Sequence, residues 1–277
     1  MVTKIIACAD IHFPLIKGFE NLEKVLSNFI TKCEKIVEEE GRDNVRIVIG
    51  GDTFHNKTNI SPENITHVYD FFKRLNCICN TIVIAGNHDY LVNNTDRIDS
   101  LTPIFEIGNL ENVTYLDREL GFKSGIFIDD NIAWCLFSSF EGFNTPSIVE
   151  SKERHKDEGL TYVGLIHGDV NGAISSTNYV VEHGLDGGMF SDCDFVIAGH
   201  IHKRQEIKKD GVKIVYCSSL RQNNFGESIS GHGFVLWDVQ NKDYEYIDVE
   251  NPDGGYFKFE VYGLEDIEND FEELINL

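Results

Sequence analysis

Five short apolar runs in this chain each end in Asp, Asn or His, and this repeated ending constrains the fold more than any other feature. The runs are rich in Ile and Val and are bounded by Gly, which indicates strands buried on both faces. The endings lie, in chain order, at residues 10–12, 50–55, 86–89, 167–169 and 199–202. In open α/β sheets, sites form outside the carboxyl ends of strands, so the five endings are expected to converge on one site.

The rest of the chain reads as strands alternating with helices, followed by hairpins. Residues 19–39 repeat apolar side chains with a period near that of a helix, and Ser61 followed by Pro62 begins a second helix expected to reach residue 75. Residues 129–131 are expected to form a hairpin turn. The expected strands are 4–8, 45–49, 81–85, 126–128, 132–137, 162–166, 195–198, 212–217, 233–239 and 244–249. The predicted class is α/β, with a mixed sheet or a two-sheet sandwich flanked by helices.

Length and composition allow one globular domain and a small appendage. The chain has 277 residues and 42% hydrophobic residues, which is ample for a core. No stretch approaches the roughly 20 apolar residues of a spanning helix, so no membrane contact is expected. The chain enters a strand at once, which predicts no signal peptide. The seven cysteines form no CxxC pair, and we expect reduced structural thiols in a cytosolic protein.

The charge is unevenly distributed. The net charge is −22, and nucleic-acid binders are usually basic. Residues 238–277 hold 13 acidic residues against two lysines, and such a run is most simply a solvated surface. Residues 203–221 are instead rich in lysine and arginine, and we expect them to form a basic lip that could hold a phosphate backbone.

The side chains at the five strand endings are suited to binding metal ions. Taken singly, each ending could equally be a capped strand end, a polar turn or a core histidine, but their shared position after buried strands favours a single site. Carboxylate, amide and imidazole ligands without thiolate suit Mn²⁺, Fe²⁺ or Mg²⁺ and can accept Zn²⁺. A carboxylate such as Asp52 could bridge two ions about 3.5–4 Å apart, as in two-metal phosphate chemistry. The glycines beside these residues would let a ligand approach the backbone closely.

At these residues the chain resembles the calcineurin-like metallophosphoesterase superfamily, whose pattern is D-x-H, G-D-x-x, G-N-H-[DE], H and G-H-x-H. The resemblance covers residues 5–202 and all five motifs. It implies two divalent ions, most simply Mn²⁺. One ion would be bound by Asp10, His12, Asp52 and His202, and the other by Asp52, Asn87, His167 and His200. It also implies that His88 acts on the substrate and that Asp89 orients it.

Within the superfamily, the chain is similar to the SbcD family of nuclease subunits and its archaeal, eukaryotic and phage relatives. Ser/Thr protein phosphatases carry G-D-x-V-D-R-G, and purple acid phosphatases need a tyrosine where this chain has His55. Residues 214–220, 225–227 and 233–236 are similar to the family's Y-P-G-S-L, F-G-E and K-G-F stretch, with Cys217 and Ser218 in place of Pro-Gly. In that family, the residue matching His55 lies near the scissile phosphate.

The SbcD resemblance implies a metal-dependent DNA exonuclease and endonuclease for recombination, repair or replication, working with an SbcC-type ATPase. It implies a cytoplasmic or nucleoid-associated protein, or one in the host cytoplasm for a phage. A homodimer would form through helices expected at residues 61–75 and 97–107. Its candidate contacts are Val68, Phe71, Phe72, Ile104 and Phe105, of which some must face the core and only part can form the interface.

The end of the chain departs from the family. Residues 1–250 are expected to form the phosphoesterase domain, and residues 251–277 the start of an incomplete cap, with a strand at 256–262 and a helix at 264–274.

Two other functions stay open. A small-nucleotide phosphodiesterase or phosphatase would agree better with the net charge, and an inactive scaffold would be expected to lack ligands that this chain retains.

Overall fold

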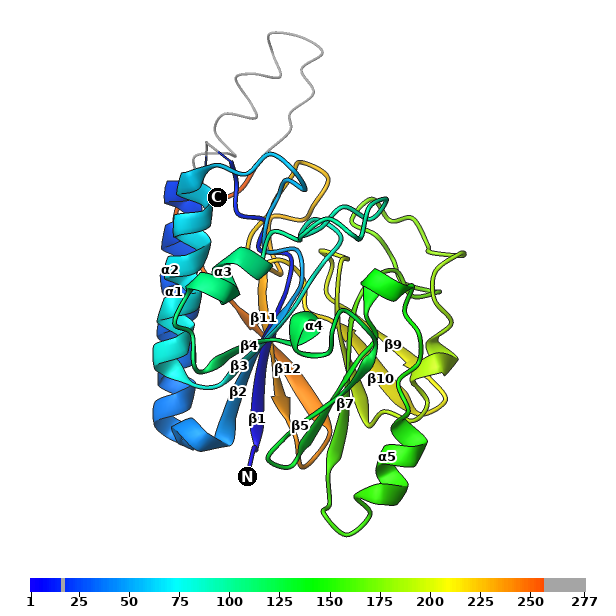
Figure 1. The fold of residues 1–277 in the computed structure, drawn as a ribbon. Helices are drawn as coiled ribbons and strands as arrows, with labels where there is room; N and C mark the ends of the chain where they lie inside the picture. The colour runs from blue at the N-terminus through cyan, green and yellow to red at the C-terminus, as the bar shows by residue number, and fades with distance from the viewer. Residues whose placement is uncertain (16–17, 257–277) are drawn as a thin grey trace, which may run out of the picture.

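The computed structural model describes residues 1–15 and 18–256. It contains two six-stranded mixed sheets packed face to face, with helices on their outer sides (Figure 1). The predicted α/β class and two-sheet sandwich are confirmed.

The first sheet contains the strands that precede three of the five motifs. Four of its strands are parallel: β1 (Lys4–Cys8), β2 (Val45–Gly50), β3 (Thr81–Ile84) and β4 (Val113–Tyr115). The hairpin of β11 (Gly233–Asp238) and β12 (Asp243–Asp248) adds to the other side of β1 in antiparallel orientation. The order is β12-β11-β1-β2-β3-β4, so the carboxyl ends of β1, β2 and β3 are neighbours.

The second sheet contains the strands before the other two motifs. Its strands are β5 (Gly125–Asp129), β6 (Ile132–Leu136), β7 (Thr161–His167), β8 (Phe195–Gly199), β9 (Gln205–Lys209) and β10 (Val212–Tyr216). The order is β5-β6-β7-β8-β10-β9, and β6, β7, β8 and β10 are parallel. The β5–β6 hairpin turns where it was predicted, at residues 129–131.

Helices cover the outer faces of both sheets. Helices α1 (Phe19–Glu40) and α2 (Pro62–Ile78) lie side by side against the first sheet (Figure 1). Ser61 caps α2 through a 3.2 Å hydrogen bond from the Asn64 N–H, as its sequence predicts. Shorter helices are α3 (Thr102–Ile107), α4 (Leu116–Glu119) and α5 (Ile148–Arg154), and three 3₁₀ turns are Arg42–Asn44, Ser139–Glu141 and Gly187–Phe190.

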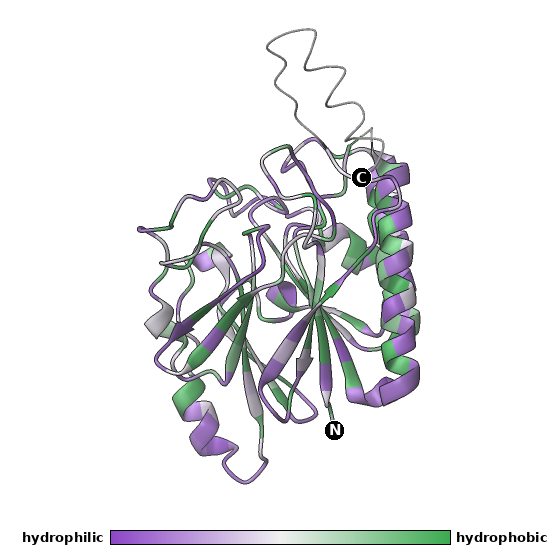
Figure 2. Ribbon diagram, turned by 180° about the vertical axis from the view of Figure 1, so that it is seen from behind, coloured by the Kyte–Doolittle hydropathy of each residue, from purple (hydrophilic) through white to green (hydrophobic). Residues whose placement is uncertain are grey.

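Apolar side chains form three layers. One fills the space between α1, α2 and the first sheet, a second lies between the sheets, and a third covers the outer face of the second sheet. Trp134 and Trp237 are fully buried in the middle layer. Figure 2 shows hydrophobic strands in the centre and hydrophilic residues along the outward side of the long helices. This packing fixes both sheets relative to each other, and therefore the loops at their ends.

Several expectations about the elements are wrong. Strands β4 and β9 were not predicted, because β4 is three residues long and β9 has a single apolar residue, Ile207. The helix expected at residues 97–107 begins only at Thr102.

Four of the five proposed dimer contacts are buried in the core, and Phe105 is partly buried against it. The four buried side chains face the core, as some of these residues were expected to, and the homodimer stays a prediction.

Three further expectations concern the cysteines, membrane-spanning helices and the cap. The seven cysteines are free, and all but Cys77 are buried. Within residues 1–15 and 18–256, no helix is both long and apolar enough to cross a membrane. The cap strand and helix expected at 256–262 and 264–274 lie outside the described residues, apart from Tyr256.

Candidate metal centre

The loops after β1, β2, β3, β7 and β8 meet at one end of the sandwich. Four of the predicted ligands there have a left-handed backbone, with φ of 55° at Asp10, 51° at His12, 52° at Asp52 and 94° at His200. This conformation costs a non-glycine residue about 1–2 kcal/mol. It turns the chain sharply after each strand and directs the side chain into the junction of the two sheets.

Glycines at these turns allow the close approach that the sequence predicted. A Cβ on Gly51 would lie 2.3 Å from His167 Nδ1, and one on Gly86 would lie 2.2 Å from the Asp52 backbone nitrogen. A side chain at either position would therefore force a metal-ligand residue to move.

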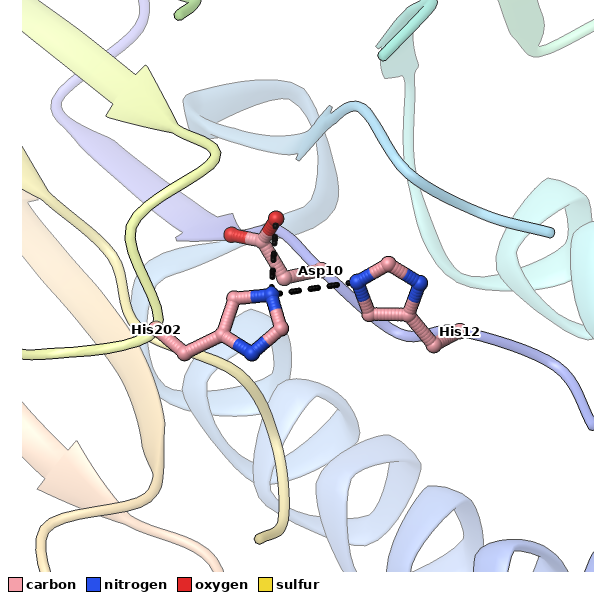
Figure 3. Close-up of side chains that lie close together, drawn as sticks. All are labelled: Asp10, His12 and His202. Carbon is pink, nitrogen blue, oxygen red and sulfur yellow. Dashed lines mark hydrogen bonds and ion pairs between the residues drawn. The ribbon is translucent and has the colours of Figure 1, made fainter. Parts of the chain in front are cut away.

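The first candidate metal site contains Asp10, His12 and His202 (Figure 3). His202 Nε2 lies 3.5 Å from Asp10 Oδ1 and 3.1 Å from His12 Nε2. The Asp10 carboxylate also accepts hydrogen bonds of 3.1 Å from the His200 backbone N–H. Three nitrogen and oxygen donors from the loops after β1 and β8 thus face one point.

The second candidate site contains Asp52, His167 and His200. His167 Nε2 lies 3.2 Å from Asp52 Oδ2, while His167 Nδ1 lies 2.7 Å from the Gly50 carbonyl oxygen, to which it can donate. Asn87 joins this group, because its Oδ1 lies 2.8 Å from His200 Nδ1.

Asp52 connects the two sites through one oxygen. Its Oδ1 accepts a 2.7 Å hydrogen bond from the His88 backbone N–H. Its Oδ2 lies 3.2 Å from His167 Nε2 and 3.7 Å from His12 Nε2, which belong to different sites. The predicted bridging carboxylate is therefore placed between the two groups, with Oδ2 as the oxygen shared between them.

The donor set fits a pair of divalent ions. His167 Nε2 is buried and has no hydrogen-bond partner among the described residues, although it points at carboxylate oxygens. A buried polar atom without a partner is costly, and a metal ion would satisfy it. The seven predicted ligands lie together at this junction and supply only imidazole, carboxylate and amide donors, which suit Mn²⁺ and related ions.

Charges within the centre shift the pKa values strongly. Burial alone would raise the pKa of Asp52, but His167 and His12 outweigh it and the pKa is lowered. Burial likewise lowers the pKa of His167 and His202, yet neighbouring carboxylates raise these pKa values to about 9 and about 10. For His12 burial prevails, and its pKa falls to about 3.

His55 and His88 stand beside the metal ligands. The ring centroid of His12 lies 4.9 Å from that of His88 and 5.4 Å from that of His55. His88 Nδ1 lies 2.5 Å from the His55 carbonyl oxygen, so its Nε2 is the ring nitrogen that can meet a substrate. Both side chains are at least partly exposed, in contrast to His12.

The Asp89 carboxylate contacts the backbone of neighbouring loops rather than the His88 ring, and its role in orienting His88 stays a prediction. The buried carboxylate accepts hydrogen bonds from the backbone N–H groups of Thr53, Phe54 and Gly86, at 3.2, 2.9 and 2.8 Å. Burial, reinforced by the charge of Asp52, raises the pKa of Asp89 to about 7. Asp89 therefore acts on the centre by joining the loops that follow β2 and β3.

Two acidic residues at the centre were not predicted from the sequence as members of the site. The Glu227 carboxylate is buried, and its Oε1 lies 2.7 Å from His202 Nδ1. Asp169 Oδ2 lies 3.6 Å from His200 Nε2, and this contact lowers the pKa of Asp169. Glu227 lies in the F-G-E stretch, and Asp169 lies in the strand ending at residues 167–169. Their places in these motifs could have identified them from the sequence.

Half of the cations in the expected basic lip are neutralised by ion pairs. Arg204 pairs with Asp248, Lys213 Nζ lies 2.7 Å from Asp243, and Lys208 Nζ lies 3.2 Å from Glu206. Arg221 is buried against backbone and amide oxygens near residue 18. Within the described part of the chain, Lys203, Lys209 and the buried Arg221 are the cations of this run that have no carboxylate partner.

Comparison with protein families matches residues 3–204 to the calcineurin-like phosphoesterases. The chain belongs to this family. Calcineurin-like phosphoesterases hydrolyse phosphate esters, and the match spans all five strand endings that form the centre.

Relatives of this calcineurin-like phosphoesterase include viral proteins. Protein R555 of Acanthamoeba polyphaga mimivirus is 33% identical over 255 residues, which is 90% of this chain but only 18% of R555. Protein 244L of Invertebrate iridescent virus 6 is 28% identical over 237 residues, covering 84% of this chain and 75% of that protein. Among solved structures, a dimetal phosphatase from Danio rerio is 11% identical with a TM-score of 0.54, covering 85% of this chain and 92% of that one, and it shares the fold.

Proposed function

We propose that this phosphoesterase is a two-metal phosphodiesterase whose substrate is DNA. The observation that carries the proposal is the pair of imidazoles, His55 and His88, beside two joined candidate metal sites. A diester leaves as an alkoxide of high pKa, so a proton donor near the breaking bond is needed. An imidazole can donate that proton at neutral pH.

Each group has a distinct task in this proposal. Asp10, His12, His202, Asp52, Asn87, His167 and His200 would hold two Mn²⁺ ions. Those ions, when bound, would activate water as the nucleophile and neutralise the charge of the phosphate. His88 donates the proton to the leaving oxygen through Nε2. His55 lies next to it, and its backbone carbonyl fixes the His88 ring.

The nuclease assignment also draws on motifs beyond the metal ligands. Glu227 of the F-G-E stretch contacts His202 directly, so this stretch belongs to the centre. An SbcC-type ATPase, a homodimer and a cytoplasmic or nucleoid location are parts of the same proposal. They rest on the resemblance to the SbcD family.

A small-nucleotide phosphodiesterase is the second candidate. It is favoured by the net charge of −22 and by the ion pairs that neutralise Arg204, Lys208 and Lys213 of the basic run. Both features weaken long-range attraction of a polyanion.

One assay separates the two candidates. The protein is incubated with Mn²⁺ and a labelled DNA duplex, a labelled single strand or bis-p-nitrophenyl phosphate. Cleavage of either DNA substrate is expected. Hydrolysis of the small diester alone would replace the nuclease proposal with the second candidate.

A further inference from the structure

A cavity of about 490 Å³ opens beside the first candidate metal site. His202 and Glu227 form part of its wall, so the cavity and the metal centre share residues. Its volume lies in the range of about 300–1,000 Å³ that is usual for ligand sites. No step of the proposed reaction uses it.

The lining of this cavity is suited to an anion. It includes hydroxyls, an amide and two cations, from Ser176, Asn178, Lys203, Arg204, Ser228 and Ser230. The single carboxylate in the wall, that of Glu227, already accepts from the Asn223 N–H at 2.8 Å and contacts His202. A chain with a net charge of −22 thus places two cations in a cavity beside its metal centre.

Lys203 is held in position by a neighbouring loop, and Arg204 by strand β12. Lys203 Nζ donates a 2.9 Å hydrogen bond to Asn178 Oδ1 and so links two loops across the cavity wall. The Arg204 guanidinium pairs with Asp248 and lies 5.0 Å from the ring centroid of Tyr246. Lys203 carries the charge that no described carboxylate neutralises.

We propose that this cavity binds the phosphate next to the scissile phosphate, and that Lys203 thereby selects a polynucleotide over an isolated diester. The inference rests on the proposed phosphodiesterase function and gives it a specificity-determining residue. A chain of nucleotides supplies a second phosphate at a fixed distance, whereas bis-p-nitrophenyl phosphate supplies none. The neighbouring phosphate would accept hydrogen bonds from Lys203 and from the serine hydroxyls.

The test uses Lys203→Gln, with Lys208→Gln as the matched control. Both remove one positive charge from the same basic run, but Lys208 pairs with Glu206 on β9 and does not line the cavity. The substrates are bis-p-nitrophenyl phosphate and a thymidine dinucleotide, unmodified or carrying an extra phosphate at its 5′ or 3′ end. Manganese content and melting temperature are recorded for every variant.

The wild type should cleave one phosphorylated dinucleotide about tenfold faster than the unmodified one, the usual weight of a charged hydrogen bond. Lys203→Gln should abolish this preference, Lys203→Arg should retain it, and Lys208→Gln should change it less than twofold. Asn178→Asp, which places a carboxylate against Lys203 from the other loop, should also abolish it.

Two results would overturn the inference. If the wild type cleaves dinucleotides but Lys203→Gln and Asn178→Asp both keep the preference, the cavity has no such role while the phosphodiesterase proposal stands. If the wild type hydrolyses bis-p-nitrophenyl phosphate and neither dinucleotides nor DNA, the nuclease proposal fails, and the cavity proposal fails with it.

Discussion

Glu227→Gln should weaken one of the two metal sites and leave the other nearly intact. The Glu227 carboxylate is buried, and its Oε1 lies 2.7 Å from His202 Nδ1. It keeps the proton of the imidazole on Nδ1, which leaves Nε2 free to bind an ion beside Asp10. Such carboxylate partners of metal-binding histidines typically contribute 10–100-fold to metal affinity, or about 1.4–2.7 kcal/mol.

The substitution is nearly isosteric, so the fold should survive. Glutamine retains one oxygen for the Asn223 N–H but loses the charge that favours the His202 imidazole in the required tautomer. Calorimetric titration of the metal-free protein with Mn²⁺ should give two sites of unequal affinity, one weakened 10–100-fold. Glu206→Gln, a surface change at the Lys208 ion pair, is the control. Equal and unchanged affinities at both sites would refute the reasoning, as would loss of both ions together.

Three further predictions concern the same centre. Asp52→Ala should reduce the bound Mn²⁺ from two ions per chain to one or none by elemental analysis, since Asp52 Oδ2 faces both sites; retention of two ions would exclude a bridge. His88→Gln should stay folded, keep both ions and lose cleavage by about 10²-fold or more; near-normal turnover would exclude a catalytic role. In EDTA-treated protein, the free energy of unfolding in urea should fall as the pH rises from about 7 to about 10. Neighbouring carboxylates raise the pKa of His167 to about 9 and that of His202 to about 10, above the unfolded value near 6.5. The folded protein therefore loses the stability that these protonated imidazoles contribute as they deprotonate. Saturating Mn²⁺ should remove this dependence, and a flat profile without metal would contradict it.

The strand endings could be predicted because each combines two local signals. The run at residues 45–49 is apolar at every position except Arg46, which indicates burial on both faces, and Asp52 follows within three residues. A parallel sheet then brings such endings to one edge without any knowledge of long-range contacts. The α/β class and the grouping of the endings within each sheet follow from these two facts, whereas the meeting of the two groups depends on how the sheets pack together.

The remaining features depend on contacts between distant residues. The hydrogen bonds of Asp89 to Thr53 and Phe54 join positions 35 and 36 residues apart, and the sequence shows only an acidic residue beside a histidine. The partners of the basic run, such as Asp248 for Arg204, likewise lie on another strand. Strand β9 was missed for a related reason, since its residues pair with β10 through the backbone and carry little apolar pattern.

The strained backbone at the ligands suggests why this centre persists as a unit. Asp10, His12, Asp52 and His200 each adopt a positive φ that costs about 1–2 kcal/mol, and a chain under selection for stability alone would place glycine at these turns. Glycine has no ligand atom, so the strain is retained where a side chain must face the junction of the sheets. Replacing His12 with glycine would therefore relieve strain while removing a donor.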